Sequence, residues 1–384
     1  MKKHPPSIPQ QGQGRLVYLD NLKVFLTALV ISHHSAIAFG ASGGWYYVIP
    51  PPPDSLAPIP MTMFAGINQA FFMGLFFFIS AYFTPLSCDK KGPAVYLKDR
   101  LLRLGVPLLA FFFVLNPSVL YLVFRFTGRI PAGYFAFMAD DLLDKTSVGP
   151  LWFVLSLLFF AGVYLLLRLL VSPRITPSAN LPLPGNRTIF LFVIGAGLFT
   201  FLVRILFPVG WAICNLQLGY FPLYIAMYTF GVLACRHAWL DTLQPRQANL
   251  WLAASVALIA LMPPLMALGG ALEGHDDVFN GGLHWQALAY ALWEPTLCIG
   301  ISMKLLLLFR RRANIENALT RALARSAYTA YILHPFFVIS GTYLLLHLPA
   351  GPFLRFLALC PLAIASCFAV SDLVRRAPAL RRIL

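Results

Sequence analysis

Long apolar segments dominate this chain and restrict the folds that it can adopt. Of its 384 residues, 59% are hydrophobic and 11% are charged, whereas charged residues make up about a quarter of an ordinary soluble protein. A helix of about 20 apolar residues is long enough to cross a bilayer. We therefore expect an all-α, polytopic transmembrane bundle of about ten spanning helices. The expected spans are 18–40, 62–85, 102–126, 151–171, 188–207, 216–236, 249–270, 286–308, 326–347 and 352–374.

The basic residues lie mainly between these segments. The net charge of +15 is not concentrated in one domain, so we expect no nucleic-acid partner and interpret the charge as a topology signal. Most Lys and Arg residues fall on one side of the predicted bundle, whereas Arg125, Arg129, Lys145 and Arg355 fall on the other. This asymmetry predicts that both termini are cytoplasmic. The expected organisation is a tail at 1–15, a membrane domain at 16–376 and a tail at 377–384.

The first span carries three ionisable side chains, which are costly in a bilayer and are therefore functional candidates. Lys23 and His34 are eleven residues apart, so a helix places them on one face, about 16 Å apart along its axis. His33 lies about 100° round the same helix. In a poorly solvated site, His34 suits a general base or a proton shuttle. The alternative is a histidine that only stabilises helix packing through a hydrogen bond to a carbonyl.

Two arginines lie where the third span begins. Arg100 and Arg103 are three residues apart and are expected on one face of a helix. At a membrane surface such guanidinium groups can clamp phosphates, and Lys23 is expected on the same cytoplasmic side. The alternative is anchoring to anionic lipid, which explains many basic residues in such positions.

Glu294 lies inside the eighth span, at about the depth expected for His34. A carboxylate at that depth can orient an imidazole or stabilise its protonated form, so we predict a catalytic role for Glu294 beside His34. The alternative is a structural hydrogen bond near Pro295, where the hydrogen-bond ladder of the helix is interrupted.

Other polar and aromatic side chains mark further surfaces. Tyr331 and His334 lie three residues apart in the ninth span, and we expect them in its cytoplasmic half, on one face that can line a channel for a polar ligand. In the connection after the first span, Trp45 and Tyr46 are expected at headgroup level. The six cysteines show no metal-ligand spacing, so we expect no metal site. The side chains predicted to line a pocket are Asn68, Ser80 and Tyr82 in the second span and Trp152 in the fourth.

Taken in order along the chain, these motifs resemble the acyltransferase-3 family of bacterial membrane O-acyltransferases. The first helix of that family has an acidic residue, a nearby arginine and, after ten further residues, a histidine; Asp20, Lys23 and His34 are similar, with lysine in place of arginine. The family's Arg-x-x-Arg motif matches Arg100 and Arg103. Its FFxxSGY-like, LWF and SYxxYLxHP motifs resemble 77–82, with Ala81 for the common glycine, 151–153 and 327–335.

The resemblance implies transfer of an acyl group, often acetyl and sometimes succinyl, from cytoplasmic acyl-coenzyme A to a hydroxyl of a carbohydrate-type acceptor. It also implies an integral protein of the bacterial inner membrane. Acyl-coenzyme A is then a co-substrate, and no permanently bound cofactor is expected. The resemblance further implies that Lys23, Arg100 and Arg103 would hold the phosphates of the donor, and we expect Tyr331 and His334 in the same donor site.

In this scheme His34 acts as a general base toward the acceptor hydroxyl or carries the acyl group transiently, and Glu294 orients it. The sequence leaves both mechanisms open. A transporter or flippase that uses the same ionisable residues as a proton relay is the main alternative function. A membrane sensor or scaffold is a third possibility, but it leaves the buried His and Glu unexplained.

Overall fold

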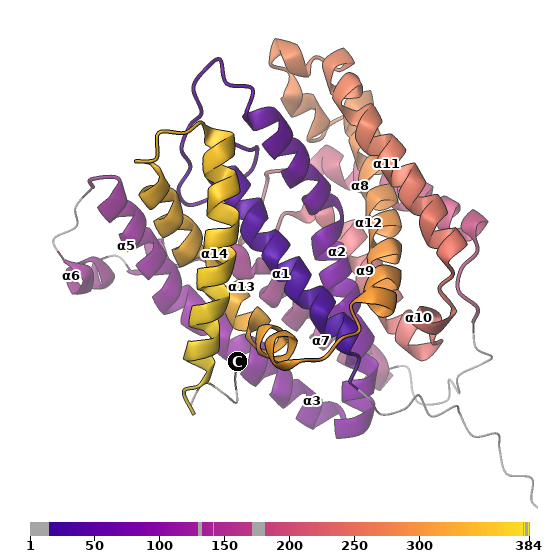
Figure 1. Cartoon of the computed structure of the whole chain (residues 1–384). Coiled ribbons are helices and arrows are strands. Elements are labelled where there is room, and N and C mark those ends of the chain that lie inside the picture. Colours follow the sequence, from indigo (N-terminus) through magenta and orange to yellow (C-terminus); the bar gives the residue numbers. More distant parts are fainter. Residues whose placement is uncertain are drawn as a thin grey trace, which may run out of the picture.

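The computed structural model describes residues 15–129, 133–140, 142–170, 181–378, 380 and 383. In these residues the chain folds into a bundle of helices and contains no β-strand (Figure 1). The long helices are α1 (Val17–Ala38), α2 (Pro58–Lys91), α7 (Trp152–Leu170), α8 (Asn186–Leu206), α9 (Phe221–Arg236), α11 (Pro245–Leu268), α12 (Trp285–Arg312), α13 (Ala318–Leu345) and α14 (Pro352–Arg375). A tenth comprises α3 (Pro93–Arg100), α4 (Val106–Ala110) and α5 (Asn116–Phe126), and α6 (Tyr134–Ala139) and α10 (Trp239–Thr242) are short.

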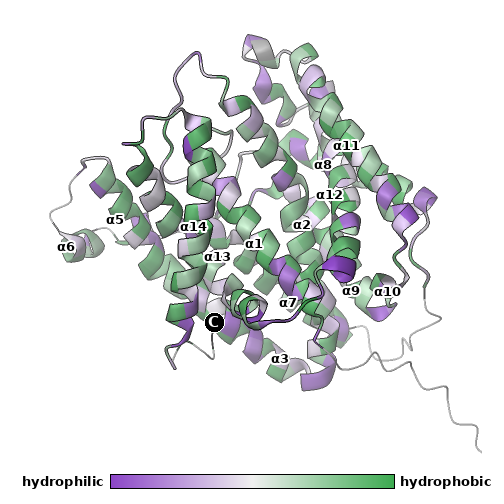
Figure 2. Cartoon of the chain, in the orientation of Figure 1, coloured by the Kyte–Doolittle hydropathy of each residue, from purple (hydrophilic) through white to green (hydrophobic). Residues whose placement is uncertain are grey.

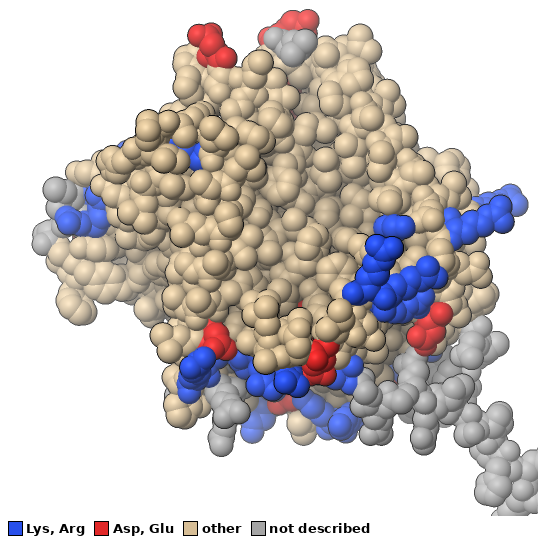
Figure 3. Space-filling model, in the orientation of Figure 1, with Lys and Arg blue, Asp and Glu red and all other residues tan. Residues whose placement is uncertain are grey.

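The expected all-α membrane bundle is confirmed, and each expected span corresponds to one long helix. Within the described residues, eight helices are long and apolar enough to cross a membrane. The other two long helices are α1 and α13, which carry His34 and His334. Apolar residues cover much of the helix surface, and polar ones concentrate near the helix ends (Figure 2). On the visible face, many basic side chains lie toward the end of the bundle at which α1 begins (Figure 3).

Several helices are longer than the apolar pattern predicts, most clearly the second, third and ninth. The second continues to Lys91, the third begins at Pro93 and the ninth begins at Ala318. The ninth begins early because Asn317 and Thr320 form a capping box, in which each side chain accepts the backbone N–H of the other at 2.9 Å. The start of α13 is therefore set by polar groups outside the apolar segment, eight residues before the predicted start.

The helix Pro93–Phe126 contains two π-helical turns, Leu101–Gly105 and Phe111–Leu115. Each π turn comes shortly before a proline, Pro107 or Pro117. Proline has no N–H to donate, and its ring collides with the carbonyl of the preceding α-helical turn, so a wider turn relieves the conflict. With 34 residues the helix is about 50 Å long, which requires a strong tilt in a bilayer whose apolar core is about 30 Å thick.

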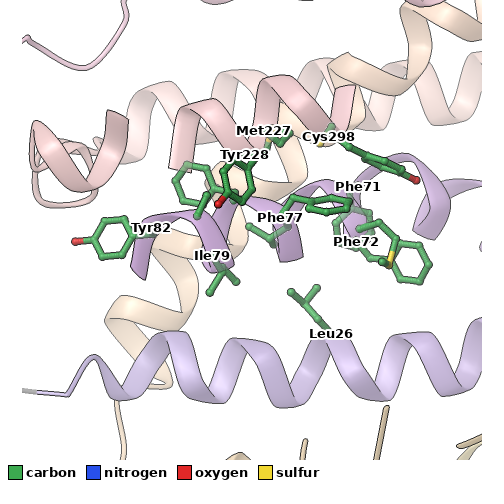
Figure 4. Packing of buried hydrophobic residues seen from close by; sticks show 14 of the residues in the cluster. Leu26, Phe71, Phe72, Phe77, Ile79, Tyr82, Met227, Tyr228 and Cys298 are labelled. Atoms are coloured by element: carbon green, nitrogen blue, oxygen red, sulfur yellow. The ribbon is translucent and has the colours of Figure 1, made fainter. Parts of the chain in front are cut away.

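The apolar core lies where α1, α2, α9 and α12 meet (Figure 4). Leu26 of α1 and Phe77 of α2 are fully buried there, together with Met227 of α9 and Cys298 of α12. Gly74 permits the close approach, because a Cβ at that position would lie 2.7 Å from the Cys298 sulfur. On the other side of α1 lies α13, which in turn packs against α14. Helix α1 is thus held from several sides, and its polar residues are kept in fixed positions.

Candidate active site

A cavity of about 670 Å³ lies at the end of the bundle opposite the start of α1. It is bordered by the connections that follow α1, α5, α8 and α11, and by the helix ends beside them. Among the described residues, its lining contains no Lys or Arg side chain. The lining is rich in aromatic and amide side chains; they are Trp45, Tyr46, Gln69, Trp152, Asn215, Gln217, Tyr220, Tyr224, Phe279, Asn280, Tyr290 and Trp293.

His34 lies in the wall of this cavity and is paired with His334. Its Nδ1 atom is 2.9 Å from Nε2 of His334, whose Nδ1 is in turn 2.6 Å from the carbonyl oxygen of Tyr331. His334 is fully buried. The indole of Trp45 covers both rings, with centroid distances of 4.1 Å to His34 and 5.6 Å to His334. The two imidazoles and the indole thus form one stacked group at the cavity.

The two histidines meet because α1 and α13 start at the same level and run side by side. The amide of Asn21 donates to the carbonyls of Ala313 and Ile315, just before α13, at 2.7 and 3.0 Å. From the helix starts, His34 and His334 then lie at nearly equal heights of about 25 Å. The expected position of His334 in the cytoplasmic half of its span was therefore wrong.

Tyr331 also differs from its predicted position at a channel for the donor. Its side chain is buried, and its hydroxyl donates to the carbonyl oxygen of Pro150, in the connection before α7. Pro150 lines the cavity. Tyr331 therefore ties α13 to the connection that borders the cavity at the end opposite the start of α1.

Glu294 is close to an arginine and not to His34. The carboxylate Oε2 lies 2.6 Å from Nη2 of Arg204, and both side chains are buried. The guanidinium is held between the rings of Tyr220 and Tyr290, 4.9 and 5.1 Å from their centroids. The predicted orienting contact from Glu294 to His34 is therefore wrong, since His334 occupies that position.

The partner of Glu294, Arg204, was not predicted from the sequence. It is a lone arginine inside the apolar segment 188–207, and such a residue indicates a buried ionic partner. A buried carboxylate needs a counter-charge in a bilayer, and Arg204 is the cation that reaches Glu294. Arg204 Nε also donates to the carbonyl of Gly219 at 3.1 Å. The pair therefore links α8, α12 and the connection before α9, behind two tyrosines that line the cavity.

The basic residues predicted to hold a donor lie near the other end of the bundle. Lys23 Nζ is 2.7 Å from Asp20 Oδ1 and lies over the ring of Phe83. Arg100 lies over the ring of Tyr96, and Arg103 is exposed. Arg103 falls in the first π turn. A π turn contains more residues than an α turn, so the angle between Arg100 and Arg103 about the helix axis is larger than the value of about 60° in an α-helix. That these residues together bind the phosphates of the donor stays a prediction.

Of the four residues predicted to line a pocket, Trp152 lies in the cavity wall. Asn68 and Tyr82 are buried in the bundle, and Ser80 is half-buried away from that wall. None of these three residues lines this cavity. At the cavity α2 presents Gln69 in place of Asn68, and Ser80 and Tyr82 lie more than ten residues further along α2. Gln69 lines the cavity, and its amide donates to the hydroxyl of Tyr224 at 3.0 Å.

The connection after α1 also differs from its predicted interfacial position. Trp45 stacks on His34, and the hydroxyl of Tyr46 donates to Asn116 Oδ1 at 2.5 Å. Asn116 follows the second π turn, and its amide donates to the carbonyl of Lys145 at 2.7 Å. Both aromatic rings are therefore fixed at the cavity by α5 and by the connection that follows it.

A family model described as "Acyltransferase domain" matches residues 16–372. Neither the curated proteins nor the solved structures give a match. The matched range begins just before α1 and ends within α14, so it includes both histidine-bearing helices and the cavity. In the part of the chain that the structure describes, eight helices are long and apolar enough to cross a membrane. The chain belongs to the acyltransferase-3 family and is an integral membrane acyltransferase.

Proposed function

We propose that this enzyme transfers an acyl group, acetyl or succinyl, from cytoplasmic acyl-coenzyme A to a hydroxyl of a carbohydrate acceptor. The observation that carries the proposal is the position of His34, an imidazole in the wall of a cavity otherwise lined mainly by aromatic rings, amides and other uncharged groups. Such a group can take a proton from a hydroxyl.

The composition of the cavity supports a sugar as acceptor. Flat rings such as Trp152 and Tyr224, stacked 5.5 Å apart, offer faces for the apolar side of a sugar ring. Gln69, Asn215 and Gln217 offer both donors and acceptors to its hydroxyls. Asp276 is the carboxylate in the described lining, and Lys and Arg are absent there. A neutral carbohydrate fits this lining better than an anionic one.

The two ends of the bundle support transfer from a cytoplasmic donor to an acceptor on the opposite side of the membrane. Arg100, Arg103 and Lys23 lie near the end where α1 begins, which the charge asymmetry predicts to be cytoplasmic. They would hold the phosphates of coenzyme A, and its thioester would extend toward His34, about 16 Å further along α1. The acceptor would enter from the opposite side, and the bacterial inner membrane is the proposed location.

In the general-base form of the reaction, His34 removes the proton from the acceptor hydroxyl as the oxygen attacks the thioester carbonyl. The new C–O bond forms, and the C–S bond breaks as the tetrahedral intermediate collapses. The proton passes from His34 to the departing thiolate, which leaves as free coenzyme A. In the covalent form, a ring nitrogen of His34 attacks the thioester carbonyl, and the C–S bond breaks as coenzyme A leaves. The acceptor oxygen then attacks the acyl group on His34, the C–N bond breaks, and the proton of the hydroxyl is left on the imidazole.

The test is acyl transfer by the purified protein in liposomes, with radiolabelled acetyl- or succinyl-coenzyme A on one side and a panel of neutral oligosaccharides on the other. We expect labelled sugar ester with the wild type and a loss of about 10²-fold or more in His34→Ala. Unchanged transfer by a folded His34→Ala protein would remove His34 from the mechanism. Proton-coupled sugar flux without ester formation would instead favour a transporter.

A further inference from the structure

We infer that His334 is a positioning residue that fixes the tautomer of His34 and so makes Nε2 of His34 the basic atom. This inference rests on the proposed role of His34 in acyl transfer. His334 thus has a function different from donor binding. In many enzymes a carboxylate orients the catalytic histidine, whereas here a neutral imidazole takes that role.

The chain of hydrogen bonds begins at a proline. In an α-helix the carbonyl of Tyr331 would accept the N–H of residue 335, but that residue is Pro335, which has no N–H. The carbonyl is therefore free, and Nδ1 of His334 lies 2.6 Å from it. A carbonyl oxygen can only accept, so Nδ1 of His334 carries the hydrogen.

The rest of the chain follows from the chemistry of neutral imidazole. A neutral ring with hydrogen on Nδ1 has a lone pair on Nε2, so His334 Nε2 is an acceptor. Nδ1 of His34, 2.9 Å away, must then be the donor. His34 Nε2 is left without a hydrogen, as a base requires.

The opposite assignment, in which His334 donates to His34, needs two hydrogens on His334 and thus a positive charge. In the described chain, the hydrogen bonds of the His334 side chain go to Tyr331 and His34, and neither partner is a carboxylate. Glu294 is already paired with Arg204. An imidazolium without a counter-ion is strongly disfavoured at this depth of a membrane bundle, so the neutral chain is preferred.

The geometry restrains His34 in two ways. The hydrogen bond to His334 fixes the rotation of the ring, and the two imidazole planes are within 12° of each other. The Trp45 indole stacks on His34 at 15° and limits its tilt. When His34 takes a proton at Nε2, its Nδ1–H bond to His334 becomes charge-assisted and stabilises the imidazolium without a buried anion in the resting state.

The first test is histidine NMR of the full-length protein in nanodiscs, labelled with ¹³C and ¹⁵N at its eight histidines. Signals are assigned by their loss in His34→Ala and His334→Ala. We expect both rings to be neutral, with hydrogen on Nδ1. Hydrogen on Nε2 of His34 in the wild type would overturn the inference, and this measurement needs no turnover.

The second test compares His334→Phe, which keeps a ring but loses the acceptor, with His334→Gln, whose amide oxygen can accept near the Nε2 position. The probe reaction is the release of free thiol from acetyl-coenzyme A as the acetyl group passes to a hydroxyl of the neutral oligosaccharides used above. His347→Gln, at an exposed histidine, is the matched control. We expect kcat to fall about 10- to 100-fold in the Phe variant. This is less than the whole contribution of a general base, which is roughly 10²–10⁴-fold, because His34 itself is still present.

The Gln variant should recover part of this loss, and KM for acetyl-coenzyme A should stay within about twofold in both. Wild-type kcat in His334→Phe would refute the positioning role, and a raised KM with unchanged kcat would return His334 to the donor site. If the NMR result holds but no sugar is acylated, the proposed function fails while the tautomer assignment stands.

Discussion

Removal of one charge from the Arg204–Glu294 pair should destabilise the protein more than removal of both. The two groups lie 2.6 Å apart with side-chain exposures of 0% and 3%, so water cannot replace a lost partner. We consider Glu294→Leu, Arg204→Met and the double variant, which substitute uncharged, apolar and shorter side chains.

The expected magnitudes follow from what each variant leaves behind. Glu294→Leu leaves a buried guanidinium, which cannot lose its proton, so its cost should be about 3–5 kcal/mol. Arg204→Met leaves a carboxyl group that can bind a proton and become neutral, so its cost should be smaller, about 1–3 kcal/mol. The double variant leaves no buried charge and should lie within about 1–2 kcal/mol of the wild type.

The assay is unfolding of the purified protein in mixed micelles by titration with SDS, followed by circular dichroism. A cost below about 1 kcal/mol for Glu294→Leu, or a double variant as unstable as the two single effects added, would refute this reasoning. Release of thiol from acetyl-coenzyme A separates the two roles of Glu294. If the carboxylate oriented His34, the stable double variant would lose this activity; we expect it to be kept within a few-fold.

Two further predictions concern the cavity and the donor. Gly149 has φ +44°, and a Cβ there would lie 2.1 Å from the Tyr46 hydroxyl. Gly149→Ala should therefore lower the free energy of unfolding by about 2–4 kcal/mol in the SDS titration. The control is Gly162→Ala, where a Cβ meets open space, and it should show no measurable loss of stability. Arg100→Ala with Arg103→Ala should weaken acetyl-coenzyme A binding at least about tenfold by calorimetry. Unchanged affinity and salt dependence would exclude a phosphate-binding role for both.

The sequence was sufficient to predict the helices and the orientation signal. Apolar length, which is a local property, determines where a chain can cross a bilayer. The cost of an ionisable group in lipid likewise identified His34 and Glu294 as residues with a special role. The family motifs, spread in order over the whole chain, predicted an acyltransferase, and the match over 16–372 confirmed that family.

The tertiary structure decided which of these polar residues meet. His34 and His334 are 300 positions apart, and no local periodicity relates them. Their common height depends on the start of α13, which a capping box places at Ala318. With the predicted start at 326, His334 would lie only about 12 Å along its helix, not about 24 Å.

The same distinction applies to Glu294 and Trp45. Glu294 needed a partner in the membrane, and Trp45 was expected at its surface. Hydropathy cannot tell whether the residue that each contacts lies on the next helix or across the bundle. Packing placed Arg204 against Glu294 and brought a tryptophan from an irregular connection onto His34. The sequence by itself determined which groups are costly in a membrane; the tertiary structure decided how each cost is compensated, because only helix packing brings residues distant in sequence within hydrogen-bond distance.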